Sequence, residues 1–143
     1  MSDRIFQTLH PGSVLGLIGV GRFGSELKRK AESAGLRTLL CDPPRCQMDA
    51  EELNDALHID WGNGMGGCDF SQLETETFVP VEVLMKYADG ISVQVPLNDS
   101  TEGMIDRTFL DRCRSSVTLW IFSDPTVVAD DVRNDEHIRF CMD

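Results

Sequence analysis

The stretch VLGLIGVGRFGSEL, residues 14–27, decides the fold of this chain. It begins as an apolar run, which predicts a buried strand, and continues with helical periodicity. Between the two, Gly19, Gly21 and Gly24 form a G-x-G-x-x-G pattern. In this pattern the first glycine allows a tight turn, the second lets the backbone approach a diphosphate, and the third lets the helix pack close to the strand. The stretch therefore predicts a strand, a turn and a helix that bind a dinucleotide.

An acidic residue one strand later supports this interpretation. A helix N-terminus offers N–H groups and partial positive charge to phosphates. Asp42 closes the next apolar run, where such sites place a carboxylate for the adenosine ribose hydroxyls. A carboxylate there repels a 2′-phosphate, which favours NAD over NADP, although Arg45 lies close enough to keep NADP open. The alternative is a glycine-tolerant turn in which Asp42 is an ordinary turn residue.

Apolar segments bounded by turn signals alternate with helical segments along the chain, as in βαβ units around a parallel sheet. We expect strands at 13–20, 37–42, 90–97, 116–124 and 137–143, and helices at 22–36, 79–89, 105–114 and 126–134. Gly35 is placed to end the first helix and Asp106 to begin the third. Residues 45–77 predict a helical turn near 49–57 within a long irregular loop. The expected fold is a single α/β domain over residues 1–143, with a Rossmann-like, doubly wound, mostly parallel sheet and helices on both faces.

One face of the first expected helix carries most of its larger apolar side chains. The residues at helical spacing on this face are Phe23, Leu27, Lys30, Ala31 and Ala34. This spacing indicates a helix.

Charge and composition narrow the class of protein. The chain has 143 residues and a formal net charge of −11, with 41% hydrophobic and 26% charged residues. This balance is typical of one globular domain, and the negative charge disfavours binding to nucleic acids and anionic membranes. No apolar run approaches the roughly 20 residues that cross a bilayer, and the first residues lack a secretory signal pattern. We expect a cytoplasmic protein.

Neither the cysteines nor the histidines predict a reactive centre. The five cysteines have no CxxC pair, and Cys41, Cys113 and Cys141 lie in or beside apolar runs that predict burial. The histidines are isolated in sequence: His10, His58 and His137. The potential ligands His58, Asp60, Cys68 and Asp69 are explained better by a glycine-rich acidic loop than by a metal site. We predict no metal.

Two stretches carry a resemblance to a known family. Residues 14–45 (VLGLIGVGRFGSELKRKAESAGLRTLLCDPPR) and 78–106 (FVPVEVLMKYADGISVQVPLNDSTEGMID) are similar to the NAD-binding domain of the D-isomer-specific 2-hydroxyacid dehydrogenases, and most of all to the erythronate-4-phosphate dehydrogenase branch. The resemblance implies hydride transfer between NAD and a 2-hydroxy acid and pairing of cofactor domains into a homodimer. For that branch it also implies a place in pyridoxine and pyridoxal phosphate biosynthesis.

The resemblance favours cofactor contacts along the carboxyl edge of the expected sheet, where open α/β sheets bind ligands. Val95, Pro96 and Leu97 end one strand at this edge, and Phe122 and Ser123 end the next. The alternative for the first group is that the proline merely ends the strand. With the turn and the acidic residue, the expected cofactor-binding set is Gly19, Gly21, Arg22, Phe23, Gly24, Asp42, Val95, Pro96, Leu97, Phe122 and Ser123.

The substrate clamp of that family has no evident counterpart here. Its members hold the substrate carboxylate with an arginine, in a pattern like Asn-x-x-Arg-Gly-x-x-Val-Asp. Aligning Val127 and Val128 with this pattern puts Asp124 and Pro125 where Arg-Gly should be, and a negative charge there repels a carboxylate. The alternative is an ordinary turn residue before proline and an alignment wrong by a few positions, with Arg133 as the nearby arginine.

The resemblance leaves the other catalytic groups of the family unassigned. RFCMD, residues 139–143, aligns Asp143 with an aspartate that contacts the nicotinamide end of NAD, and we add Asp143 to the cofactor-binding set. The family's glutamate, its histidine and its substrate-binding domain are not found in these residues, so we expect no catalytic residue in this chain. We expect a truncated or degenerate relative that is not active alone. Two alternatives stay open: an NAD-sensing regulatory or partner-binding module, and the cofactor half of a split enzyme completed by a partner chain.

Overall fold

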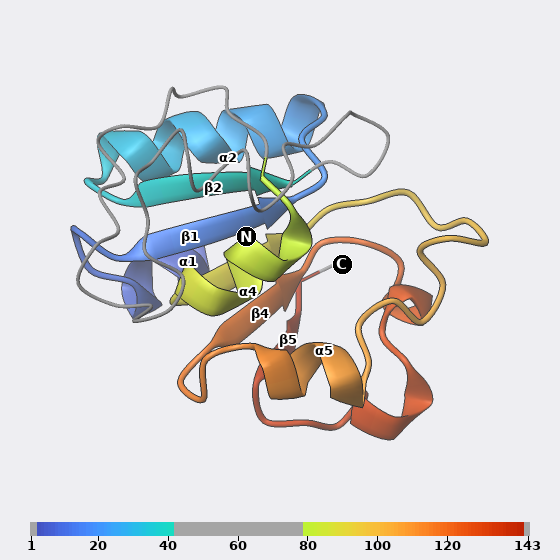
Figure 1. The fold of residues 1–143 in the computed structure, drawn as a ribbon. Helices are drawn as coiled ribbons and strands as arrows, with labels where there is room; N and C mark the ends of the chain where they lie inside the picture. Colours follow the sequence, from blue (N-terminus) through green and yellow to red (C-terminus); the bar gives the residue numbers. More distant parts are fainter. Residues whose placement is uncertain (1–2, 42–78, 142–143) are drawn as a thin grey trace.

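Five parallel strands form the centre of the molecule. The computed structural model describes residues 3–41 and 79–141. In sequence order the strands are β1 (Val14–Ile18), β2 (Arg37–Cys41), β3 (Gly90–Val93), β4 (Thr118–Ile121) and β5 (Ile138–Phe140). They lie side by side in the order β2-β1-β3-β4-β5, and every pair is parallel (Figure 1). The predicted parallel α/β sheet is confirmed.

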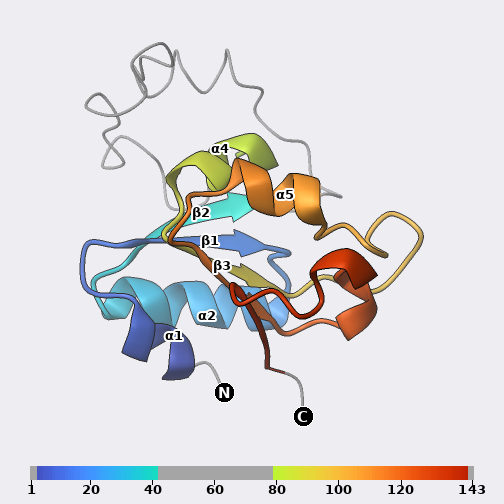
Figure 2. The same ribbon diagram turned by 90° about the horizontal axis from the view of Figure 1, so that it is seen from below.

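Helices cover both faces of this sheet, as predicted. They are α1 (Asp3–Thr8), α2 (Arg22–Ser33), α4 (Val81–Tyr87) and α5 (Arg107–Arg112). Figure 2 shows α1 and α2 on one face and α4 and α5 on the other. Each pair of helices encloses its own apolar core against the strands. All five residues of β1 are buried, as expected for a central strand covered on both sides.

Small residues in the strands let the layers approach closely. A Cβ on Gly16 in β1 would lie 2.5 Å from Leu84 Cγ of α4, so that helix packs directly against the strand backbone. A Cβ on Gly90 in β3 would lie 2.5 Å from Cζ3 of Trp120, whose side chain is 1% exposed. Trp120 is thus a packing residue of the α1 and α2 face.

The ends of α2 and α5 follow from their capping residues. Gly35 follows α2 with φ +85°, a left-handed conformation that ends a helix and that glycine adopts most easily. The Asp106 carboxylate accepts a hydrogen bond from Phe109 N–H at 2.9 Å and so begins α5. Both predicted caps are confirmed.

The buried face of α2 includes only two of the residues noted at helical spacing, Leu27 and Ala31. It consists of Gly24, Leu27, Lys28 and Ala31, whereas Phe23, Lys30 and Ala34 are exposed. Gly24 lies close to the Gly19 carbonyl of the preceding turn, whereas Phe23 beside it faces outward. The buried stem of Lys28 carries its ammonium to Glu32, at 2.8 Å.

Residues 126–134 do not form the predicted helix. They contribute to two short 3-10 turns instead, η2 (Pro125–Val127) and η3 (Asp130–Val132). Between them Val128 is fully buried and makes an isolated parallel bridge with Ile105. β-Branched residues favour such extended backbone, which explains the difference. Conversely, α1 was not predicted, because six residues are too few for a clear helical period.

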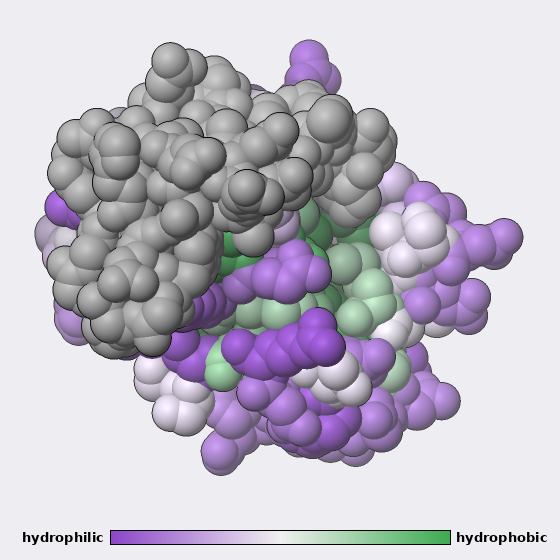
Figure 3. Space-filling model, viewed as in Figure 1, coloured by the Kyte–Doolittle hydropathy of each residue, from purple (hydrophilic) through white to green (hydrophobic). Residues whose placement is uncertain are grey.

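The face of the molecule seen in Figure 3 has an apolar region near α4. In Figure 3 green apolar side chains gather there among purple polar ones. Within residues 3–41 and 79–141, no helix is long and apolar enough to cross a bilayer, and no group of histidine, cysteine or acidic residues could hold a metal. The expected turn near 49–57 and the potential ligands His58, Asp60, Cys68 and Asp69 lie outside these residues.

Candidate dinucleotide site

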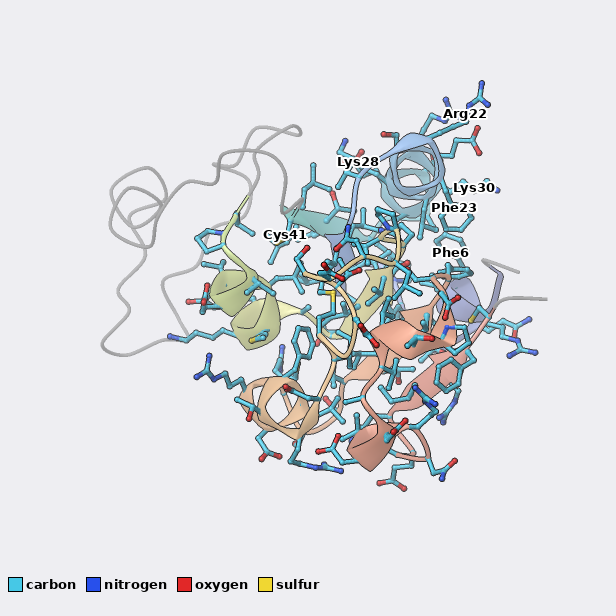
Figure 4. All side chains as sticks on the ribbon, turned by 90° about the vertical axis from the view of Figure 1, so that its right-hand side faces the viewer. Phe6, Arg22, Phe23, Lys28, Lys30 and Cys41 are labelled. Carbon is cyan, nitrogen blue, oxygen red and sulfur yellow. The ribbon has the colours of Figure 1, made fainter. Side chains whose placement is uncertain are left out.

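The strand order places a ligand site at the carboxyl ends of β1 and β3. From β1 the chain moves to β2 on one side, and β3 then pairs with β1 on the other side. Open α/β sheets bind ligands at the carboxyl edge, where the strand order reverses in this way. Figure 4 views the molecule from this side, with Arg22 and Phe23 at the start of α2 and Cys41 at the end of β2.

Gly19 forms the turn between β1 and α2. Its φ is +91°, a conformation that residues with a side chain rarely adopt. A Cβ on Gly19 would also lie 2.6 Å from the Gln94 carbonyl oxygen, a backbone atom that cannot rotate away. The Gly19 N–H donates to the Cys41 carbonyl at 2.8 Å. The turn is therefore bonded to the end of β2, next to the position of Asp42.

Gly21 and Gly24 complete the turn in different ways. A Cβ on Gly24 would lie 2.5 Å from the Gly19 carbonyl oxygen, whereas a Cβ on Gly21 would meet nothing within 4 Å. Gly21 precedes α2 as its N-cap, and no side chain caps that helix end. The first N–H groups of a helix have no partner within the helix, so those at the start of α2 are candidate donors beside this open space. These features fit a diphosphate, which needs bare backbone donors and room for close approach.

Gln94 is a component of this site that the sequence analysis missed. Its side-chain Nε2 donates to the carbonyls of Ile18, at 3.1 Å, and Gly19, at 2.6 Å. Its Oε1 accepts from the hydroxyl of Ser92, at 2.5 Å. The sequence signal was a lone glutamine following a polar Ser92 in an otherwise apolar strand end. Gln94 thus connects β3 to the glycine turn.

Some of the strand-end residues predicted to contact the cofactor are buried and hold the strands together, and others are exposed. Val95 is buried, and its N–H donates to Ser123 Oγ at 2.7 Å. Ser123, which is 4% exposed, donates in turn to the Val93 carbonyl at 3.3 Å. Pro96 and Leu97 are exposed. Ser123 therefore ties the ends of β3 and β4 together, while the next two residues after Val95 present a surface.

Two predicted aromatic residues contact each other at the same edge. The rings of Phe23 and Phe122 lie 4.9 Å apart between centroids and are tilted by 47°. Phe23 is 41% exposed and Leu97 is 44% exposed, and they are the large apolar side chains that stand out from the described surface. Arg22 is exposed at the outer side of α2 (Figure 4). Asp42 and Asp143 lie outside the described residues.

Asp124 follows β4 as an exposed carboxylate. It accepts hydrogen bonds from Thr126 N–H at 2.9 Å and Thr126 Oγ1 at 2.6 Å, and so caps η2. The Thr126 hydroxyl and N–H, and to a lesser degree Arg133, lower the pKa of Asp124, so the group is a carboxylate at neutral pH. The guanidinium of Arg133 is occupied by the Val128 carbonyl, at 2.9 Å, and by Asp130, at 3.1 Å. Asp124 is a turn residue, and Arg133 serves the same loop.

The described cysteines are unreactive packing residues. Cys41 and Cys141 are buried, and Cys113 is partly buried. Burial raises the pKa of the Cys113 thiol to about 11, so that the nucleophilic thiolate is scarce near neutral pH. His10 is exposed. Among these positions, Cys41 takes part in the candidate site through its backbone carbonyl, which accepts from Gly19 N–H.

His137 lies at the opposite, amino edge of the sheet between two acceptors. Its Nδ1 lies 2.6 Å from Asp135 Oδ1, and its Nε2 lies 3.0 Å from the Ser115 carbonyl. Both acceptors are satisfied when the ring carries two protons. The Asp135 carboxylate and then the Ser115 carbonyl raise the pKa of His137 above its ordinary value.

This geometry predicts a pH dependence of stability. A raised folded pKa makes the His137 contribution complete below the unfolded value of about 6.5, and it is lost as the pH rises through the folded pKa. We expect the melting temperature of the natural chain to exceed that of His137→Gln by a few degrees near pH 5.5, with the gap shrinking toward pH 8.5. A constant gap in thermal melts across this range would contradict the assignment.

Comparison with known proteins agrees with the site. The D-isomer specific 2-hydroxyacid dehydrogenase, NAD binding domain family matches residues 2–131. The erythronate-4-phosphate dehydrogenase of Porphyromonas gingivalis is 33% identical over 121 residues, which cover 82% of this chain and 26% of that protein. The enzyme of the same name from Yersinia pestis is 36% identical over 84 residues, covering 59% of this chain and 16% of that protein. The chain thus spans about a quarter or less of these relatives.

Solved structures show the same fold. The NAD-dependent formate dehydrogenase from Staphylococcus aureus, in complex with NAD, superposes with a TM-score of 0.66 at 18% identity, over 100% of this chain and 38% of that one. The NAD-complexed D-isomer specific 2-hydroxyacid dehydrogenase from Lactobacillus delbrueckii ssp. bulgaricus gives 0.62 at 22% identity, over 92% and 35%. The strand order, the glycine turn and the family match lead to one conclusion: this chain belongs to the D-isomer-specific 2-hydroxyacid dehydrogenase family, as an NAD-binding domain.

Proposed function

We propose that this chain holds NAD for a dehydrogenase of the erythronate-4-phosphate type, and that the groups that complete the reaction come from outside these residues. The observation that carries the proposal is the bare glycine turn at the uncapped start of α2, with open space at Gly21 and steric closure at Gly19 and Gly24. The identity of 33% to an erythronate-4-phosphate dehydrogenase supports the substrate class.

Each part of the edge has a task in this proposal. The N–H groups at Gly21, Arg22, Phe23 and Gly24 hold the diphosphate, and Asp42 accepts hydrogen bonds from the adenosine ribose. Val95, Pro96, Leu97, Phe122 and Ser123 form or support the surface beside the nucleotide, and Asp143 contacts its nicotinamide end. When bound, NAD supplies the acceptor for a hydride from the hydroxyl-bearing carbon of the substrate. The chain's own residues bind and orient the cofactor.

The wider setting of the proposal follows from the same relatives. We place the protein in pyridoxine biosynthesis, in which the erythronate-4-phosphate dehydrogenase branch works, and, from its sequence, in the cytoplasm. Pairing with a chain that carries a substrate-binding domain would bring the missing acid–base groups to the cofactor, whereas pairing with a second copy would join two cofactor domains. The substrate-binding domain is therefore sought on another polypeptide or another part of the protein.

Titration with NAD tests the binding proposal. We expect calorimetry to show NAD and NADH binding, and Asp42→Ala to weaken it by roughly 10- to 150-fold, because hydrogen bonds to a charged group contribute about 1.5–3 kcal/mol. Asp111→Ala is the matched control, since it removes the same charge from an exposed position on α5. Equal affinities of the two variants would contradict the ribose assignment, and no binding at millimolar ligand would contradict the whole proposal.

The exposed carboxylate of Asp124 favours a second candidate, in which this chain senses NAD and does not take part in turnover. A negative group after β4 repels the carboxylate of a hydroxy acid, whereas a cofactor sensor needs no substrate clamp. A neighbouring reading frame that encodes a substrate-binding domain would favour the split enzyme. A neighbouring reading frame that encodes a regulator or a transporter would favour the sensor.

Replacing Asp124 distinguishes these candidates. In the presence of a substrate-domain partner, we expect Asp124→Arg to raise turnover of a 2-hydroxy acid on the order of tenfold, because repulsion of the substrate becomes attraction. Asp124→Asn is the control, because it removes the charge, retains an acceptor for Thr126 and adds no clamp. Steady-state assays in which Asp124→Arg and Asp124→Asn behave alike would remove Asp124 from the substrate site.

A further inference from the structure

We propose that Gln94 is a positioning residue for the dinucleotide: its side-chain amide fixes the glycine turn in the conformation that aims the α2 N–H groups at the diphosphate. This inference rests on the proposed function, in which those N–H groups hold NAD. Gln94 acts through the backbone of Ile18 and Gly19, and no direct contact with the ligand is needed.

The orientation of the amide follows from its neighbours. The carbonyls of Ile18 and Gly19 only accept hydrogen bonds, so the amide nitrogen must face them. The Ser92 hydroxyl, in a residue that is 0% exposed, donates to the amide oxygen. Both ends of the amide are thus specified, and the side chain is held in one orientation between β3 and the turn.

The Gly19 carbonyl is the part of the turn that needs holding. Glycine populates positive and negative φ about equally, so the φ of +91° is not enforced by Gly19 itself. The Gly19 N–H is bonded to Cys41, and Gln94 bonds the carbonyl on the other side of the residue. Because the peptide unit is planar, fixing this carbonyl also fixes the direction of the following N–H. The backbone then reaches Gly21 in a defined orientation.

Sheet stability does not depend mainly on this amide. β1 and β3 pair over four residues of regular parallel ladder, and both strands are covered by apolar cores. We therefore expect loss of the Gln94 amide to act more strongly on NAD affinity than on unfolding. A purely structural hydrogen bond between the same strands should do the reverse.

Asp89 offers that structural comparison. Its carboxylate accepts from Val14 N–H at 2.8 Å and so joins the residue before β3 to the start of β1, at the edge opposite the glycine turn. We expect Gln94→Leu to weaken NAD binding at least tenfold in calorimetry, and Asp89→Ala to change it less than about twofold, with comparable losses in melting temperature. Equal NAD affinities of these two variants, measured well below both melting temperatures, would overturn the proposal.

Gln94→Glu supplies a readout that a merely structural role would not produce. An ionised carboxylate facing two carbonyl oxygens is repelled, whereas the protonated acid keeps one donor for the Gly19 carbonyl. Among the described residues, the hydrogen-bond partners of the Gln94 side chain are the Ile18 and Gly19 carbonyls and the Ser92 hydroxyl, and these groups do not titrate. NAD affinity of Gln94→Glu relative to the natural chain should therefore rise several-fold as the pH falls from 8 to 5.

The outcomes separate this inference from the proposed function. If the natural chain binds NAD and Gly21→Ala weakens binding while Gln94→Leu does not, the turn is the site and Gln94 is not a positioning residue. If the natural chain does not bind NAD, the proposed function and this inference both fail. Should Gln94→Leu not fold, Gln94→Glu decides, and a relative affinity that does not vary with pH overturns the inference.

Discussion

Replacing Gly19 by alanine should lower the free energy of unfolding by roughly 2–6 kcal/mol. A residue with a side chain at positive φ is strained by about 1–3 kcal/mol, and crowding in a packed site adds about 1–3 kcal/mol. Both effects apply here, because φ is +91° and the new Cβ would lie 2.6 Å from the Gln94 carbonyl oxygen. Urea unfolding measures the change.

Two other glycines serve as controls for this prediction. Gly12 has φ +92° with nothing near a Cβ, so Gly12→Ala reports the backbone strain alone. Gly21 has neither positive φ nor a close neighbour, so Gly21→Ala should leave unfolding nearly unchanged and weaken NAD binding about tenfold or more. A Gly19→Ala variant no less stable than Gly12→Ala would show that the turn has room for a side chain.

The second large effect concerns Trp120. We expect Trp120→Ala to cost about 3–5 kcal/mol of unfolding free energy, because the indole is 1% exposed and its removal leaves a cavity. Gly90 makes this cavity difficult to fill, since it offers no side chain beside the ring. Leu97→Ala, at a position 44% exposed, should change stability by no more than about 0.5 kcal/mol.

A double-mutant cycle tests the contact with Gly90 directly. Gly90→Ala alone should destabilise by about 1–3 kcal/mol, since its Cβ would lie 2.5 Å from the Trp120 ring. In a Trp120→Phe background the shorter ring gives this methyl group room, and the two changes should cost less together than their sum. Strict additivity in urea unfolding would show that the two residues do not compete for the same space.

The glycine turn could be predicted from the local sequence, whereas contacts between residues distant in sequence could not. Gly19, Gly21 and Gly24 could be interpreted because they form one short pattern between a predicted strand and a predicted helix, although the residue that closes on Gly19 is the distant Gln94. The role of Gln94 could not be predicted, because its partner Gly19 lies 75 residues away and the local sequence of a strand end does not indicate a distant hydrogen-bond partner. The burial of Lys28 and the exposure of Phe23 could not be predicted for a related reason, since they depend on how α2 packs against the rest of the fold.

The segment after β4 also depends on contacts that are distant in sequence. We predicted a helix at residues 126–134 from local propensity. The segment instead pairs with the distant Ile105 through Val128 and forms short 3-10 elements on either side. The roles of Asp42 and Asp143 stay predictions, because both lie outside the described residues. The interpretation of Asp124 was open between a lost clamp and a turn residue, and its bonds to Thr126 establish the turn geometry.

The bridge between Ile105 and Val128 has a consequence for how a ligand would be received. Gly103 and Ile105 donate backbone hydrogen bonds to Thr126 and Val127, and Ala129 donates back to Ile105. These hydrogen bonds join the loop after β3 to the loop after β4, so that the two loops form one rigid wall. Since such a wall has little conformational entropy left to lose, its amide hydrogens should exchange together and slowly even in the empty protein, and a bound nucleotide should change them little.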